Sequence, residues 1–99
     1  MMTRDDAKKL VDGYLVQLQT GRAYELRVLD ELTREEDFGW VFFFYNSRRF
    51  VETRDIQWAL GGNAPLIVDK YTGELHVTGT SHPVEHYIER YRRGRVASR

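Results

Sequence analysis

The sequence contains no cysteine, only two prolines and no long run of apolar residues. Without cysteine, disulfide scaffolds, thiol catalysis and thiolate metal sites are excluded, and the composition fits a reducing cytoplasm, where we expect the protein to act. The longest apolar run, Trp40 to Tyr45, is far too short to span a bilayer. The N-terminal segment MMTRDDAKKL has no apolar stretch of signal-peptide length, so we expect no membrane partner.

The chain also lacks an excess of charge of either sign. Fifteen Lys and Arg residues balance fifteen Asp and Glu residues, which argues against a dedicated nucleic-acid-binding protein and against a polybasic membrane-surface protein. Hydrophobic residues make up 41% and charged residues 30% of the chain, as in ordinary folded domains. A length of 99 residues predicts one domain, residues 1–99, that buries roughly 65% of its unfolded surface.

Near the N-terminus, the apolar periodicity predicts an amphipathic helix from Thr3 to Leu18. Apolar residues recur three or four positions apart on one face of this helix: Ala7, Leu10, Val11, Tyr14, Leu15 and Leu18. Thr3 and Asp6 have the spacing of reciprocal N-terminal caps. Gly21 suits a position just beyond the last turn, so we expect the helix to end before it.

A second amphipathic helix is predicted near the C-terminus. Its inner stripe consists of Val84, Tyr87, Ile88 and Tyr91. Ser81 or His82 is expected to cap this helix, with Pro83 in its first turn. Gly94 is expected to end it, and residues 91–99 to form a frayed basic tail.

Between the helices, side-chain alternation predicts short strands joined by turns. Phe38 to Tyr45 is apolar on both faces, which predicts a central strand. Other elements are predicted by position: strands at 24–32, 48–52, 66–68 and 74–78, a polar loop at 33–37, a short helix at 53–60 and a turn with left-handed Gly73. Because the links between strands are short, the expected fold class is α+β, an antiparallel sheet of four to five strands with an N-terminal and a C-terminal helix packed on it.

One motif matches a string found in zinc peptidases, His82-Pro83-Val84-Glu85-His86. Two histidines four residues apart on a helix share a face and suit zinc. A catalytic zinc site needs a third protein ligand, however, and His76 lies on a predicted strand at an unknown distance. We therefore expect no catalytic residue, no metal and no cofactor, and a zinc hydrolase acting through His82, Glu85 and His86 stays as an alternative.

Two clusters of charge lie along the chain. Acidic residues form one segment, interrupted by Arg34: Asp30, Glu31, Glu35, Glu36 and Asp37. Arginines form the basic end: Arg90, Arg92, Arg93, Arg95 and Arg99. Each cluster is explained either by solvation of an exposed segment or by electrostatic steering of a protein partner. The five acidic residues are our candidates for partner binding, and they would oppose nucleic-acid binding by the basic end.

Several pieces of the sequence together carry a resemblance to a known family: Phe38 to Phe42, Leu60 to Asp69, Gly73, Gly79-Thr80 and Pro83 to Ile88. From about Val11 to Tyr91, the chain resembles the immunity protein 35 domain family. The motif residues that we take as structural are Trp40, Gly61, Gly62, Asn63, Pro65, Asp69, Gly79, Thr80, Pro83 and Tyr87. Among them, Gly61-Gly62-Asn63 lacks the lysine of a phosphate-binding loop and is better explained as a turn.

The resemblance implies a small bacterial antitoxin-like protein of a polymorphic toxin system. Such a protein binds a cognate toxin domain and blocks it without catalysis. The doubly apolar strand Trp40 to Tyr45 supports a different class, a small chaperone-like or self-associating module, since few predicted elements are available to cover both of its faces. A homodimer is compatible with either function.

Overall fold

The computed structural model describes residues 2–19, 26–46 and 64–97. In chain order its elements are α1 (Arg4–Gln19), β1 (Leu26–Val28), the 3₁₀ turn η1 (Asp30–Leu32), β2 (Arg34–Glu36), β3 (Gly39–Phe42), β4 (Phe44–Asn46), β5 (Leu66–Asp69), β6 (Leu75–Val77) and α4 (Val84–Ala97). Some predictions fall outside the described residues: the strand at 48–52, the helix at 53–60, the turn Gly61-Gly62-Asn63, and the places of Gly21 and Arg99.

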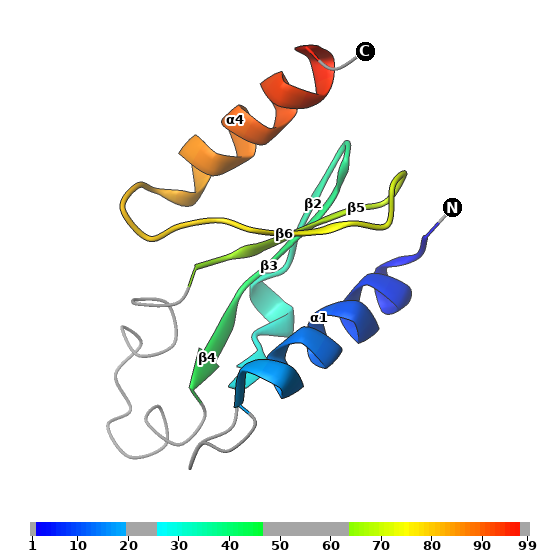
Figure 1. The fold of residues 1–99 in the computed structure, drawn as a ribbon, viewed down its shortest axis with the longest axis vertical. Coiled ribbons are helices and arrows are strands. Elements are labelled where there is room, and N and C mark those ends of the chain that lie inside the picture. The colour runs from blue at the N-terminus through cyan, green and yellow to red at the C-terminus, as the bar shows by residue number, and fades with distance from the viewer. Residues whose placement is uncertain (1, 20–25, 47–63, 98–99) are drawn as a thin grey trace.

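Four strands form an antiparallel sheet in the order β2-β3-β5-β6. In the register of this sheet, Trp40 of β3 lies opposite Val68 of β5 and Glu35 of β2. β1 and β4 form a separate two-stranded ladder, with Val28 opposite Phe44. Figure 1 shows α1 on one side of the sheet and α4 on the other. The expected α+β fold, with a terminal helix at each end of the chain, is confirmed.

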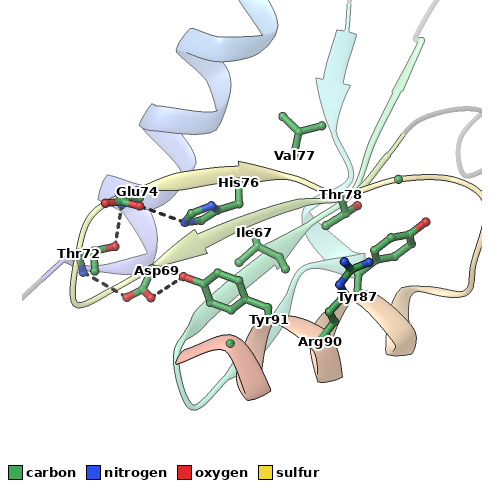
Figure 2. Close-up of a pocket in the computed structure, with 12 residues that line it drawn as sticks. Ile67, Asp69, Thr72, Glu74, His76, Val77, Thr78, Tyr87, Arg90 and Tyr91 are labelled. Atoms are coloured by element: carbon green, nitrogen blue, oxygen red, sulfur yellow. Dashed lines mark hydrogen bonds and ion pairs between the residues drawn. The ribbon is translucent and has the colours of Figure 1, made fainter. Parts of the chain in front are cut away.

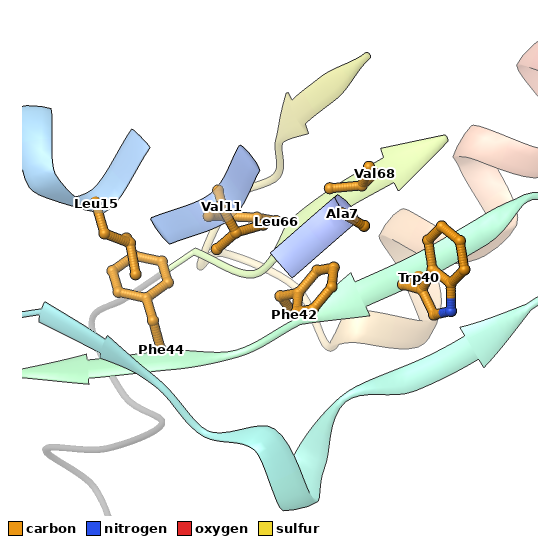
Figure 3. Close-up of a cluster of buried hydrophobic side chains, with 8 residues drawn as sticks. All are labelled: Ala7, Val11, Leu15, Trp40, Phe42, Phe44, Leu66 and Val68. Atoms are coloured by element: carbon orange, nitrogen blue, oxygen red, sulfur yellow. The ribbon is translucent and has the colours of Figure 1, made fainter. Parts of the chain in front are cut away.

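The central strand buries side chains on both of its faces, as its sequence predicts. The core on the α1 side (Figure 3) consists of Ala7, Val11, Leu15, Trp40, Phe42, Phe44, Leu66 and Val68. The smaller core on the α4 side consists of Phe38, Val41, Ile67 and Ile88. Successive residues of β3 and β5 enter opposite cores because strand side chains alternate between the two faces of a sheet. Each helix therefore covers a face that would otherwise be exposed and apolar.

The start of α1 has the predicted reciprocal caps. The backbone N–H of Asp6 donates to Thr3 Oγ1, and the backbone N–H of Thr3 donates to Asp6 Oδ2, both over 3.2 Å. The backbone N–H of Thr3, and after it the Thr3 hydroxyl, lower the pKa of Asp6 because both favour its charged carboxylate. The caps fix where the helix starts, so Ala7, Val11 and Leu15 face the sheet.

Three predictions about the strands are wrong. The strand predicted at 24–32 ends at Val28, because Asp30–Leu32 forms the 3₁₀ turn η1. The segment at 33–37 is not a loop, because Arg34–Glu36 forms β2 and pairs with β3. The predicted strand from Phe38 to Tyr45 is interrupted at Phe43, whose carbonyl accepts a hydrogen bond from the backbone N–H of Leu29 over 2.8 Å. This bond turns the chain away from the main sheet and starts the β1–β4 ladder. At Gly39, φ is +151° and a Cβ would overlap the carbonyl oxygen of Val68, so only glycine fits there.

The predicted limits of the C-terminal helix also need correction. α4 begins at Val84, directly after Pro83, so Pro83 precedes the first turn. Neither Ser81 nor His82 directly precedes the helix as a cap would, and Ser81 Oγ instead lies 3.2 Å from the hydroxyl oxygen of Tyr87 in a hydrogen bond. The helix continues past Gly94 to Ala97, and residues 91–97 are helical rather than a frayed tail. Gly73, by contrast, has φ +74°, as predicted for the turn between β5 and β6.

Candidate protein-binding site

Three of the five acidic candidates form ion pairs within the chain. Asp30 in η1 accepts a 2.8 Å hydrogen bond from Lys8 Nζ on α1, and its backbone carbonyl accepts one from Arg4. The Asp30 carboxylate raises the pKa of Lys8, since it favours the protonated amine. Asp30 therefore ties η1 to the first helix. Because both side chains are substantially exposed, the pair adds little stability and mainly fixes geometry.

The other two paired acids join the β2–β3 turn to the basic helix. Arg92 of α4 donates to Glu36 Oε1 over 2.9 Å and to Asp37 Oδ1 over 3.1 and 3.2 Å. The hydrogen bonds to Asp37 and Glu36 raise the pKa of Arg92 further above its already high range. Its guanidinium also lies 5.7 Å from the centre of the Phe38 ring. The acidic segment and the basic end are far apart in the sequence, but ion pairs of Arg92 with Glu36 and Asp37 join them in the fold.

Glu31 and Glu35 are the acidic candidates left on the surface. Both are exposed, and within the described parts of the chain neither forms an ion pair. Arg34, which lies between them in the sequence, instead donates to Glu85 of α4 over 3.0 Å and lies 3.5 Å from Glu36. The alternation in β2 explains this division, because residues 34 and 36 face α4 whereas Glu35 faces the other way.

The histidine string does not bring its three residues to one point. The rings of His82 and His86 lie 4.2 Å apart between centroids. The Glu85 carboxylate is bound to Arg34, on the side of the helix that faces β2. Among the described residues, no group of three or more His, Cys, Asp or Glu side chains is arranged to hold a metal ion.

A groove that the sequence did not predict lies between β6 and α4. Its volume is about 770 Å³. Figure 2 shows side chains from both walls directed into it. The residues that line it include Ile67, His76, Tyr87, Arg90, Tyr91 and Gly94. Such a mixture of apolar surface and a few polar groups is typical of binding sites.

The buried carboxylate of Asp69 is part of the lining of this groove. Its side chain is 1% exposed. Oδ1 accepts hydrogen bonds from the backbone N–H groups of Tyr71 and Thr72, over 2.8 and 3.1 Å, and Oδ2 accepts one from the Tyr91 hydroxyl over 2.6 Å. Asp69 thus shapes the β5–β6 turn and holds α4 against it. A buried carboxylate is tolerated because these donors replace the water it loses.

His76 and Arg90 provide the other charged groups of the groove. The His76 ring lies 5.1 Å from the Tyr91 ring between centroids, tilted by 54°, and its Nε2 lies 3.3 Å from Glu74 Oε2. Arg90 is exposed on α4, and it forms no ion pair with any other residue that the structure describes. The groove therefore has paired acidic groups at one end and an available cation on its helical wall.

Several of the motif residues that the structure describes make contacts within the fold. Trp40 is in the core, and the Pro65 carbonyl accepts hydrogen bonds from the backbone N–H and the hydroxyl of Thr78, over 3.1 and 2.6 Å. At Gly79, a Cβ would come within 2.7 Å of the Tyr87 hydroxyl oxygen, so the missing side chain leaves room for that ring. Thr80 and Pro83 are exposed in the link to α4.

A weak sequence signal for the groove exists at two residues. Asp69 ends an apolar strand immediately before a turn, where an aspartate commonly bonds backbone donors two and three residues later. Tyr91 lies on the inner stripe of its helix and needs a partner for its hydroxyl. The open space itself has no sequence signal, because it depends on how far α4 stands from β6.

Comparison with known proteins assigns this architecture to a family. A family model described as Immunity protein 35 matches residues 5–94, almost the whole chain. The chain belongs to the immunity protein 35 family. A relative in Escherichia coli K12, described as uncharacterized protein YrhB, is 47% identical over 91 residues, which cover 92% of this chain and 89% of the relative. No solved structure matches.

Membership of the immunity protein 35 family supports an immunity-type role for this chain. It agrees with the resemblance carried by the Gly39, Asp69 and Pro83 segments, all of which lie inside the matched range. Within the described residues of this family member, no helix has both the length and the apolar character needed to cross a membrane.

Proposed function

We propose that this chain is a non-enzymatic immunity protein that binds a cognate toxin domain of a polymorphic toxin system and occludes it in the cytoplasm. The observation that carries the proposal is the family match over residues 5–94. Immunity by occlusion requires a stable shape with an accessible binding surface of about 800 Å² on the inhibitor's side. The rigid sheet between two helices, with the groove beside β6, is consistent with this requirement.

The arrangement of charged side chains supports binding rather than catalysis. Asp69 is occupied by three donors, Glu85 by Arg34, and Glu36 by Arg92. A general acid or base must be free to exchange a proton with a substrate, whereas these carboxylates hold elements of the fold together. The same geometry weighs against the zinc hydrolase, because Glu85 is directed to Arg34 and away from the histidine pair.

The chaperone-like alternative rested on a strand with two apolar faces. Trp40, Val41 and Phe42 are at most 5% exposed, because α1 and α4 cover the two faces. That feature is explained by the fold and no longer requires a client protein. The immunity function is therefore the one that the described geometry and the family favour together.

The test begins with the genes that flank this one, where the proposal expects a large secreted protein with a toxin domain at its C-terminus. Production of that domain should arrest growth of the host cell, and co-production of this chain should restore it. In a titration of purified toxin domain, residual activity should fall linearly and reach zero at one chain per toxin domain. Full growth arrest with the chain present would refute the proposal. Neutralisation by far less than one equivalent would indicate an enzyme instead.

A further inference from the structure

β6 forms one edge of the four-stranded sheet that the structure describes. On the inner side, Ile67 lies opposite His76, and this pair is flanked by the bonds Asp69 N–H to Glu74 O and Thr78 N–H to Pro65 O. Hydrogen-bonded pairs alternate along an antiparallel ladder. Leu75 and Val77 therefore direct their backbone N–H and C=O groups away from β5. Within the described residues, no strand pairs with this edge.

Such an edge binds an extended polypeptide through its main chain. Val77 is 55% exposed, so an added strand would cover apolar surface as well as satisfy backbone groups. Alternate side chains of that strand would enter the groove between β6 and α4, where Tyr87 and Tyr91 form an aromatic wall (Figure 2). Edge and groove together make one continuous surface for a single extended segment.

The charges of the groove select the chemistry of the occupant. Glu74 lies against His76, and Asp69 accepts from Tyr91, whereas Arg90 has no ion-pair partner among the described residues. A segment that places a carboxylate beside Arg90 would complete the site. A second copy of this chain docked on the same edge supplies no uncommitted carboxylate from its own groove, which disfavours a symmetric dimer here.

We propose that β6 and the adjoining groove bind an extended segment of a partner protein as an additional antiparallel strand, with an apolar side chain in the groove and an acidic one on Arg90. The inference rests on the proposed function only for the partner's identity, which would be the toxin domain. The strand-adding surface itself is tested without the toxin, so that the two proposals fail separately.

The probe is a phage-displayed library of random linear peptides, selected on the immobilised full-length chain. Enriched peptides should carry an apolar residue and an Asp or Glu two positions apart, so that both side chains face the groove. In hydrogen exchange, the strongest of them should protect the amides of Leu75 and Val77. Failure to enrich any peptide, or protection confined to other elements, would overturn the proposal. Sedimentation that shows a dimer with these two amides already protected would also overturn it, because a second copy would then be the occupant.

Val77→Pro provides the sharpest variant. Proline removes an N–H that points outward, so the bonds between β5 and β6 remain, and proline is tolerated on edge strands. We expect it to weaken peptide binding about tenfold, the effect of one lost hydrogen bond plus steric obstruction. The control Val77→Thr keeps the N–H and the shape and should bind within about twofold of the parent chain. Equal affinity of the proline and threonine variants would contradict strand addition.

Two further pairs of variants keep the test decisive if Val77→Pro does not fold. Gly94 lines the groove and a Cβ there meets no atom within 4 Å, so Gly94→Leu should fold and obstruct binding. Gly13→Leu on α1 is its control, because a Cβ there also meets no atom within 4 Å.

The second pair of variants tests the charge of the groove. Arg90→Glu should weaken peptide binding about tenfold. Arg93→Glu changes an exposed arginine outside the groove and should leave peptide binding nearly unchanged. Binding that is insensitive to Gly94 and Arg90 would exclude the groove.

The toxin domain is then measured against the same variants. If the parent chain neutralises the toxin and the Val77, Gly94 and Arg90 variants do so equally well, the immunity function stands and the groove is not its interface. If the peptides bind as expected and the toxin domain does not, the groove stands and the immunity function fails.

Discussion

At the scale of single residues, Asp69 joins the β5–β6 turn to α4, a role that the composition of the chain does not reveal. Its carboxylate serves two backbone donors of the β5–β6 turn and one hydroxyl of α4, with 1% of the residue exposed. Family resemblance identifies the residue as part of a motif but says nothing about its partners. Asp69 can be buried because hydrogen-bond donors converge on it, since a carboxylate in an apolar setting is stable only with such donors.

The hydrogen bond from Tyr91 to Asp69 is tested by Tyr91→Phe. This change removes one donor from a buried charge and keeps the ring, so the free energy of unfolding in urea should fall by about 1.5–3 kcal/mol. Tyr14→Phe is the control, because Tyr14 packs at the edge of the other core with no bond from its hydroxyl to a described residue. That variant should change stability by less than about 0.5 kcal/mol. Equal effects of the two variants would show that the Tyr91 hydroxyl contributes nothing specific.

At the scale of elements, the sequence predicted the strongly patterned segments well. The stripe in α1, the two apolar faces of β3 and the turn at Gly73 all follow from local periodicity or backbone preference. β2 was missed because its three residues are Arg34, Glu35 and Glu36, which carry no apolar signal. Their strand is specified by tertiary contacts, since Arg34 and Glu36 bind side chains of α4.

The end of α4 was misplaced for a related reason. A glycine lowers helix propensity but does not by itself stop a helix, and Gly94 lacks the left-handed conformation of a terminating glycine.

The pairing of the acidic candidates could not be predicted from the sequence either. Sequence alone identifies Glu36 and Asp37 as charged, but not that Arg92, 55 or more residues away, neutralises them. The groove depends on the spacing of two elements and could not be foreseen.

The helical state of Gly94 leads to a stability prediction for α4. Gly94→Ala should raise the free energy of unfolding by up to about 1 kcal/mol, because alanine loses less backbone entropy in a helix and meets no neighbour within 4 Å. Gly13→Ala in α1 is a matched comparison, with the same open surroundings. Urea unfolding of both variants provides the measurement. Destabilisation by Gly94→Ala alone would show that α4 ends at Gly94 in solution, as the sequence had suggested.

At the scale of the whole molecule, the net charge is zero, but the unpaired charges are distributed unevenly over the surface. Lys8, Arg34 and Arg92 are paired with acids inside the chain, while Glu31 and Glu35 stay exposed near the β2 edge and Arg90 faces the groove beside β6. These are opposite edges of the sheet. An exposed, unpaired charge acts on a partner during diffusion, whereas a charge within a closed interface acts on dissociation.

This separation predicts different kinetic effects at the two edges during association with the toxin domain. Replacing Glu31 and Glu35 by glutamine should slow association roughly two- to tenfold at low salt and flatten its dependence on ionic strength. Asp5→Asn with Asp12→Asn is the control, because these exposed residues of α1 change the net charge equally and lie outside the acidic segment of the sequence. Stopped-flow fluorescence at several salt concentrations measures both rates. If the control variant slows association as much, net charge alone steers the partner. If neither pair of substitutions slows association, the acidic segment has no part in recognition, and the edge at β6 is the remaining candidate interface.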